Sequence, residues 1–257
     1  MVENLLSNIR IVLVEPAGEL NLGSIARIMK NMGLTNLVLV NPMCDRNSED
    51  ARRMAVHAVD VLEKATVVDS LPIALEGCQR AIATTVRSRS VPIQLEPASA
   101  TLPWLLTPNV QSALLFGAEE RGLSNDELKY AQRFVCIPSN PDYPSLNLAQ
   151  AVAICSYELY QAWLKIKDDP KAEIISAPQQ VTVSTNAPID VLEGYYQHLE
   201  TLLLEIGYLL PHTAPVKMEK FRRLYNKANL QPEEVAMLRG ILRQVRWAIE
   251  QGTKENS

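Results

Sequence analysis

The sequence has neither a Cys-x-x-Cys pair nor any cluster of cysteine and histidine. Its four cysteines lie far apart, at Cys44, Cys78, Cys136 and Cys155. This pattern favours free thiols in a reducing compartment over disulfides or a zinc site. We therefore expect a cytoplasmic protein that binds no metal ion.

Long apolar segments are also absent. No apolar run approaches the length of a transmembrane helix, and the first ten residues lead into a predicted strand without the apolar region of a signal peptide. Neither G-x-G-x-x-G nor G-x-x-x-x-G-K-[ST] occurs. The sequence thus predicts no membrane partner and argues against a nicotinamide or ATP enzyme.

Positive charge is in deficit, because the formal net charge is −4. A nucleic acid would therefore have to bind a local basic patch, since the whole chain does not attract it. At 257 residues and 47% hydrophobic, the chain can bury a full core as one large domain or as a large and a small one.

Short apolar runs alternate with helical patterns over the first 165 residues. The runs predict buried strands at residues 9–14, 37–40, 66–68, 81–85, 113–116 and 133–137. This alternation is typical of an α/β fold with a parallel sheet and helices on both faces. Residues 91–111 contain three prolines, and we expect a long connection there with one short helix.

The remaining features centre on residues 112–151. Here a glycine-rich loop follows one predicted strand, and a loop stiffened by Pro141 and Pro144 follows the next. Between them, Ser124 and Glu127 have the spacing of a capping box. Because both loops leave parallel strands in the same direction, they should line one crevice at the carboxyl edge of the sheet, where such folds bind ligands.

The predicted helix 147–164 has a wide apolar face with several small residues. One sheet face cannot cover all of this surface. We therefore expect a stripe that includes Val152 and Leu159 to contact a second copy of the chain in a homodimer.

The first predicted helix covers residues 21–33. Asn21 is a good N-cap, and Gly33 stands where a left-handed C-cap would end the helix. Arg27 falls opposite the apolar stripe, so it should point to solvent or to a site.

Hydroxyls alternate with Arg87 and Arg89 in the loop after the fourth predicted strand. Two interpretations stay open for this loop. It is either a solvated polar connection or a set of guanidinium and hydroxyl groups that contact phosphate oxygens.

The character of the chain changes after residue 165. Residues 166–187 lack periodicity and read as a linker, and 188–257 read as an all-helical extension. Over residues 217–246, eight basic and three acidic side chains give a local charge of +5. Together with Phe221 and Tyr225, this segment predicts an RNA-facing surface with Lys220, Arg222 and Arg223.

Three separated motifs together resemble the SPOUT superfamily of RNA 2′-O-methyltransferases. They are residues 21–27 (NLGSIAR), 116–123 (FGAEERGL), and 137–138 (IP) with 145–149 (SLNLA). Further segments, including RSRS at 87–90, YYQHLETLLLEIGY and FRRLYNKA, are similar to TrmJ-type tRNA methyltransferases. That family modifies the ribose of nucleotide 32 in the anticodon loop. The resemblance covers nearly the whole chain and is weakest over 91–111 and the linker.

The resemblance implies a trefoil knot in the C-terminal part of the sheet, a homodimer and S-adenosylmethionine as the methyl donor. It implies that Arg27 is catalytic, as a base or as a clamp for phosphate and alkoxide. It implies pocket or RNA-contacting roles for Asn21, Glu119, Asn147, Arg87 and Arg89. The implied cofactor-binding residues are Thr84, Thr85, Val86, Gly117, Ile137, Pro144, Ser145 and Leu146.

Several alternatives remain at this level. Asn21 is either a pocket residue or only an N-cap, and Ser145 and Asn147 either bind ribose or start a helix. The substrate nucleotide is cytidine alone or also uridine. A ribosomal-RNA methyltransferase of the same fold and a non-catalytic RNA-binding protein are the competing functions.

Overall fold

The computed structural model describes residues 5–86, 94–168 and 186–255. The chain divides into two compact units, Met1–Gln180 and Val181–Ser257. The last helix of the first unit ends at Asp168, so the beginning of the predicted linker 166–187 is helical. Residues 169–185 of that linker lie outside the described residues.

The first unit is built on a seven-stranded sheet in the order β3-β2-β1-β6-β4-β7-β5. Every neighbouring pair is parallel, as predicted. The strands are β1 (Ile9–Val14), β2 (Asn36–Val40), β3 (Thr66–Val68), β4 (Arg80–Thr84), β5 (Leu95–Pro97), β6 (Ser112–Phe116) and β7 (Arg133–Cys136). Central strands β1 and β6 are buried on both faces, which explains their continuous apolar sequences. The trefoil knot stays a prediction.

The segment before β6 was predicted incompletely. Instead of a connection with one short helix, it contains strand β5, helix α5 (Ala98–Thr101) and a 3₁₀ helix (Leu102–Leu105). Strand β5 pairs with β7, at the edge of the sheet. A strand of three residues that ends in Pro97 has no alternating pattern to recognise, and proline is tolerated because the position is at an edge.

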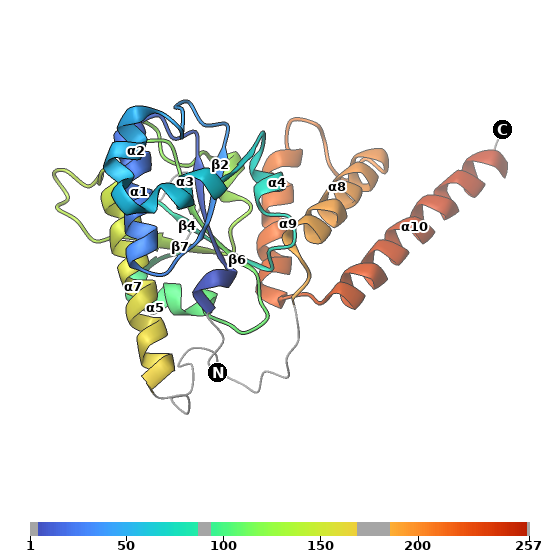
Figure 1. Ribbon diagram of the computed structural model, residues 1–257. Coiled ribbons are helices and arrows are strands. Elements are labelled where there is room, and N and C mark those ends of the chain that lie inside the picture. The colour runs from blue at the N-terminus through green and yellow to red at the C-terminus, as the bar shows by residue number, and fades with distance from the viewer. Residues whose placement is uncertain (1–4, 87–93, 169–185, 256–257) are drawn as a thin grey trace. The chain divides into compact units, whose positions relative to one another are not determined.

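Helices cover both faces of this sheet (Figure 1). Helices α1 and α7 lie side by side on one face, and α4 lies on the other. Besides α5, the α-helices of this unit are α1 (Glu19–Asn31), α2 (Glu49–Ala55), α3 (Val59–Lys64), α4 (Leu71–Ala74), α6 (Asn125–Leu128) and α7 (Leu148–Asp168), with further 3₁₀ helices at Leu5–Asn8 and Val56–Ala58.

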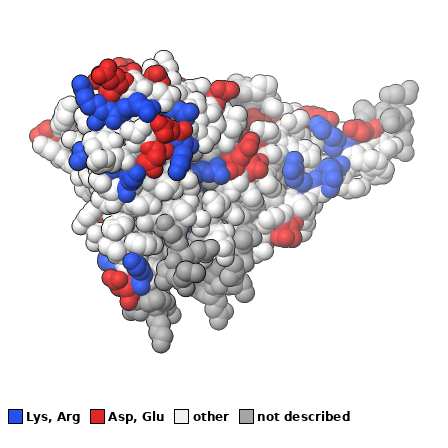
Figure 2. Space-filling model, viewed as in Figure 1, with Lys and Arg blue, Asp and Glu red and all other residues white. Residues whose placement is uncertain are grey.

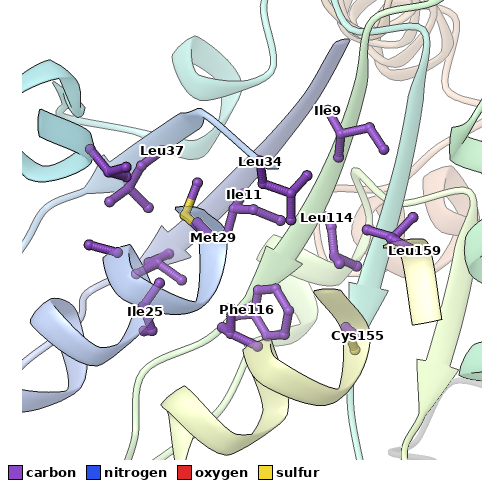
Figure 3. Packing of buried hydrophobic residues seen from close by; sticks show 14 of the residues in the cluster. Ile9, Ile11, Ile25, Met29, Leu34, Leu37, Leu114, Phe116, Cys155 and Leu159 are labelled. Atoms are coloured by element: carbon purple, nitrogen blue, oxygen red, sulfur yellow. The ribbon is translucent and has the colours of Figure 1, made fainter. Parts of the chain in front are cut away.

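The core lies between the sheet and the pair α1 and α7. Figure 3 shows side chains of β1 and β6 pointing toward Met29 of α1 and toward Cys155 and Leu159 of α7. Val152 and Leu159 are fully buried there, within a single chain. The prediction that their stripe contacts a second copy is therefore wrong, because the sheet and α1 cover it. The large apolar side chains that α7 leaves exposed are Ile154 and Tyr157.

The α1 and α2 helices meet with their backbones in near contact. A Cβ on Gly23 would lie 2.2 Å from the carbonyl oxygen of Ala51, closer than packing allows. The glycine of the NLGSIAR motif thus serves helix packing. The predicted C-cap glycine, Gly33, has a φ of 69°, in the left-handed region.

The described part of the second unit, residues 186–255, consists of three helices, as predicted. They are α8 (Ile189–Glu205), α9 (Ala214–Ala228) and α10 (Pro232–Glu255). Pro232 opens α10 at the first helical position, where its missing N–H costs nothing. Tyr195, Tyr196, Met218 and Val235 belong to the core of this unit.

Arg222 lies inside this core region. Its side chain forms an ion pair with Glu193 through both guanidinium nitrogens, one contact of which is 2.7 Å, and its guanidinium lies 4.5 Å from the ring centroid of Tyr196. Only 8% of the residue is exposed. The sequence had grouped Arg222 with an RNA-facing surface, but its guanidinium is already occupied within the fold.

Arg222→Ala should therefore act on stability. Removing one partner leaves Glu193 largely buried and uncompensated, which costs about 3–5 kcal/mol of unfolding free energy. The matched control is Lys220→Ala, an exposed position on the same helix, where we expect a change within about 0.5 kcal/mol. Urea unfolding followed by circular dichroism measures both. Equal stability of the two variants would show that the ion pair does not hold the unit together.

Candidate active site

A cavity of about 350 Å³ opens at the carboxyl ends of β4, β6 and β7. Its position agrees with the crevice predicted from the two loops. Seven of the eight predicted cofactor-binding residues line it, namely Thr84, Thr85, Val86, Gly117, Ile137, Ser145 and Leu146. The exception is Pro144, whose carbonyl oxygen accepts a hydrogen bond of 2.8 Å from the Ser139 hydroxyl.

The glycine-rich loop closes tightly on itself after β6. A Cβ on Gly117 would lie 2.1 Å from the carbonyl carbon of Gly122 and 2.2 Å from the nitrogen of Leu123. Gly122 has a φ of 67°, and its N–H donates to the carbonyl of Ala118 at 2.8 Å. Gly117 is therefore required by the loop's own main chain, in addition to lining the cavity.

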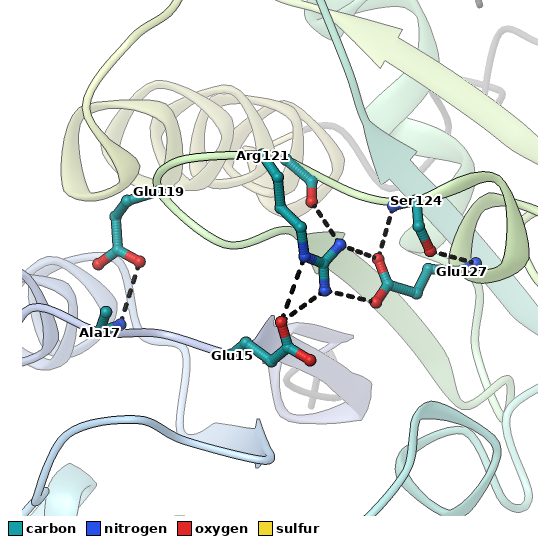
Figure 4. Close-up of polar contacts among 7 residues, drawn as sticks. Glu15, Ala17, Glu119, Arg121, Ser124 and Glu127 are labelled. Atoms are coloured by element: carbon teal, nitrogen blue, oxygen red, sulfur yellow. Dashed lines mark hydrogen bonds and ion pairs between the residues drawn. The ribbon is translucent and has the colours of Figure 1, made fainter.

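Arg121 fastens this loop to two other segments (Figure 4). It donates to Glu15, which follows β1, at 2.7 Å and to Glu127 of α6 at 2.8 Å. Glu127 also accepts from the N–H of Ser124 at 2.6 Å, and the Ser124 hydroxyl caps α6, so the predicted capping box is confirmed. Burial acts to raise the pKa of Glu127, but hydrogen bonds from Arg121 and Ser124 prevail and lower it.

The sequence singled out Arg121 only as part of a motif and assigned it no role. The sequence did contain a hint that Arg121 forms an ion pair, because the acidic residues Glu119, Glu120 and Glu127 are close to it in sequence. However, the partner Glu15 is 106 residues away, so the bridge to the end of β1 was not predictable.

Glu119 ties the glycine-rich loop to the segment that enters α1. Its carboxylate accepts from the N–H groups of Ala17 and Gly18, both at 3.1 Å, and from the side-chain amide of Asn21 at 3.2 Å. Partial burial acts to raise the pKa of Glu119, but these hydrogen bonds, together with one from its own amide, lower it below its usual value. An ionised Glu119 therefore holds the segment that enters α1.

Asn21 is not an N-cap. Helix α1 begins two residues earlier, after Gly18, whose N–H is held by Glu119, and no side chain caps the helix. The side-chain oxygen of Asn21 instead accepts from the amide of Asn147 at 3.0 Å. The oxygen of Asn147 accepts from the N–H of Ala149 at 2.9 Å and so starts α7.

Arg27 lies on the exposed side of α1, away from the core, as predicted. Its side chain forms no hydrogen bond or ion pair with any other residue that the structure describes. It is also not among the residues that line the cavity. Within one chain, the predicted catalytic group and the predicted cofactor pocket are thus not brought together.

The remaining predicted residues fall into two groups. Arg87 and Arg89 lie outside the described residues, so both interpretations of their loop remain predictions. Lys220 is exposed on α9, and Arg223 is partly exposed. In the described ranges, no helix is long and apolar enough to cross a membrane, and no group of three His, Cys, Asp or Glu residues could hold a metal ion.

Sequence families match both units of the chain. The family described as "SpoU rRNA Methylase family" matches residues 8–157, and "tRNA methyltransferase TrmJ, C-terminal domain" matches residues 190–256. The fold and the cavity therefore belong to the class of SpoU-type methylases.

Individual relatives narrow the class of SpoU-type methylases to one family. Proteins called tRNA (cytidine/uridine-2′-O-)-methyltransferase TrmJ from Klebsiella pneumoniae and Pectobacterium atrosepticum are 42% and 43% identical. The matches cover 93% and 94% of this chain and 96% and 98% of the relatives. The crystal structure of TrmJ from Z. mobilis ZM4 has a TM-score of 0.77 and 32% identity, over 92% of this chain and 98% of that one. The chain belongs to the TrmJ family.

Proposed function

We propose that the protein is an S-adenosylmethionine-dependent tRNA methyltransferase of the cytoplasm. It methylates the ribose 2′-hydroxyl of nucleotide 32 in the anticodon loop, with cytidine and uridine as candidate bases. The observation that carries the proposal is that two distant motifs line one cavity, and the first motif is joined to both of them through the hydrogen bonds of Asn21 with Glu119 and Asn147. The names of the relatives support tRNA as the substrate. The free thiols support a reducing compartment.

The cavity fits such a cofactor. Its volume of about 350 Å³ lies within the range of small-molecule sites, roughly 300–1,000 Å³. Val86, Ile137 and Leu146 offer apolar surface for an adenine ring, and the loop from Gly117 offers main-chain groups nearby. When bound, S-adenosylmethionine supplies an activated methyl group, and the protein supplies binding and orientation.

Arg27 is the proposed catalytic residue. Guanidinium groups stay protonated in proteins, so a literal role as a base is disfavoured. A clamp that holds a phosphate and stabilises the negative charge developing on the ribose 2′-oxygen is the easier role. Its exposed position without a partner among the described residues leaves the guanidinium open to RNA.

The proposed enzyme acts as a homodimer. Because Arg27 does not line the cavity of its own chain, a complete site requires a further component, and a second copy can provide it. The exposed Ile154 and Tyr157 on α7 are candidates for the interface in place of the buried Val152 and Leu159.

The proposed function is tested by mapping 2′-O-methylated nucleotides by mass spectrometry after incubation of tRNA or ribosomal RNA with the protein and cofactor. We expect modification of nucleotide 32 in tRNA and none in ribosomal RNA. Modification of ribosomal RNA alone would support the competing methyltransferase. Absence of modification together with absence of cofactor binding by calorimetry would support a non-catalytic RNA-binding protein.

A further inference from the structure

We propose that His198, Arg239 and Arg243 form a binding surface for the sugar-phosphate backbone of RNA, between helices α8 and α10. We call these three residues the α8/α10 cluster. The inference rests on the proposed function, because it identifies where the C-terminal unit contacts its RNA. It also moves that contact away from α9, where the sequence placed it.

The cluster is assembled by the packing of α10 on α8. The guanidinium of Arg239 crosses to α8, where it lies 3.5 Å from the point that a Cβ on Gly194 would occupy. His198 is one turn further along α8 on the same side, and Arg243 is one turn beyond Arg239 on α10. The cluster therefore forms a strip along α8 and α10. Gly194, which has no side chain, lies at one end of this strip.

Its charge is only partly compensated. Arg246, the next basic residue of α10, pairs with Glu205 of α8 at 2.9 Å. Arg239 and Arg243 are exposed, and neither side chain has a hydrogen bond or ion pair within the described part of the chain. Figure 2 shows Lys and Arg side chains gathered in the region of α10. Two uncompensated guanidinium groups thus stand in a chain whose net charge is −4.

The charges of α10 act on His198 of α8. Burial, followed by the charges of Arg246, Arg239 and Arg243, lowers its pKa below the usual value. The imidazole is therefore largely neutral at neutral pH, and a neutral imidazole still carries one N–H donor. A phosphate placed on the strip would meet guanidinium groups and this donor together.

The chemistry of the cluster fits RNA. Guanidinium groups match pairs of phosphate oxygens in a bidentate geometry, which ammonium groups cannot do. Trp247 lies one turn after Arg243 and is 55% exposed, so an aromatic ring for base stacking adjoins the cationic strip. An acidic protein segment would use the charges but would not need the ring.

Helix α9 offers fewer unpaired guanidinium groups for phosphate than the α8/α10 cluster does. Arg222 is buried against Glu193, and Lys217 lies over Tyr208 and donates to its carbonyl oxygen. Lys220, Arg223 and Lys227 remain at or near the surface of α9, and only Arg223 among them is a guanidinium group. Lys220 and Arg223 supply a matched control, because replacing either pair with alanine removes two positive charges from the same unit.

The test compares Arg239→Ala/Arg243→Ala with Lys220→Ala/Arg223→Ala in the full-length protein. Binding of an unmodified tRNA transcript is measured by fluorescence anisotropy over a series of salt concentrations. We expect the first pair to weaken binding by roughly tenfold or more and to reduce the salt slope by about 2, one for each lost phosphate contact. The control pair should change both quantities much less. Arg239→Lys/Arg243→Lys should recover only part of the affinity, since the fork is lost.

Three results would overturn the proposal. The first is unchanged tRNA affinity in the Arg239/Arg243 variant, with circular dichroism confirming its fold. The second is an equal loss in both pairs, which would indicate general electrostatics. The third is a polyglutamate probe that binds as tightly as tRNA and is lost in the same variant, which would assign the cluster to an acidic protein.

Kinetics separate this proposal from the proposed function. At saturating tRNA, the Arg239/Arg243 variant should methylate at the wild-type rate and show only a raised KM, with unchanged cofactor affinity. If wild-type protein binds tRNA through the cluster but transfers no methyl group, the proposed function fails and the inference stands. If the wild type methylates tRNA and the variant keeps the same KM, only the inference fails.

Discussion

Arg27→Ala should reduce the rate of methyl transfer by roughly 10²-fold or more, a typical loss for one group that stabilises a transition state. Cofactor affinity and stability should stay close to wild type, because the side chain is exposed and lines no part of the cavity. Single-turnover rates with saturating tRNA measure the effect. Arg53→Ala is the control, since it removes an exposed arginine from neighbouring helix α2 and should leave the rate unchanged.

Arg27→Lys distinguishes the two roles. A point charge keeps part of the attraction to phosphate but cannot form the bidentate contact, so the clamp predicts partial activity with little dependence on pH. A base predicts that the lysine variant gains activity steeply as the pH approaches about 10, where an ammonium group begins to lose its proton. Near wild-type rates for Arg27→Ala would instead identify Arg27 as a solvated helix arginine without a catalytic role.

Gly117→Ala should disable the cavity. The new Cβ would stand 2.1 Å from the carbonyl carbon of Gly122, and main chain cannot yield as a flexible side chain can. The loop would have to open, which moves Glu119 and Arg121 away from their partners at the start of α1 and the end of β1. Because displacements of about 1 Å can cost 10²-fold, we expect cofactor affinity and methyl transfer to fall by roughly that factor or more.

Gly122→Ala is the control in the same loop. Nothing lies within 4 Å of a Cβ at Gly122, but its φ of 67° disfavours a side chain. It should therefore show only the backbone strain, about 1–2 kcal/mol of stability, and a much smaller loss of cofactor affinity. Calorimetric titration with S-adenosylmethionine and thermal unfolding compare the two variants. Wild-type cofactor affinity in Gly117→Ala would mean that the loop relaxes without consequence for the pocket.

Local patterns predicted most of the first unit. The strands of the parallel sheet are continuous apolar runs because both of their faces are buried, and this signal requires no knowledge of the neighbours. The capping box at Ser124 and Glu127 is equally local, since its groups are three residues apart. The same holds for the three helices of the second unit, where Pro232 opens α10.

The wrong predictions arose where a local sequence pattern is compatible with two different tertiary contacts. Helical periodicity placed Val152 and Leu159 on one face of α7, but it could not show what packs against that face. The core of the same chain packs against it. Arg222 belonged to a basic segment, yet its partner Glu193 lies 29 residues away on another helix. A charged side chain in a sequence is usually expected to be exposed to solvent. Only the packing of the helices reveals that such a side chain forms an ion pair inside the fold.

The sequence by itself determined the α/β class, the helical extension and the motifs that belong to the site. Only the tertiary structure decided how the motifs are joined. Glu119 reaches Asn21 across 98 residues and Asn147 reaches Asn21 across 126. It also decided why Gly117 has no side chain, and that Arg239 of α10 lies beside Gly194 of α8. These contacts depend on distances between segments that are remote in sequence, and such distances exist only after the sheet and the helices have packed.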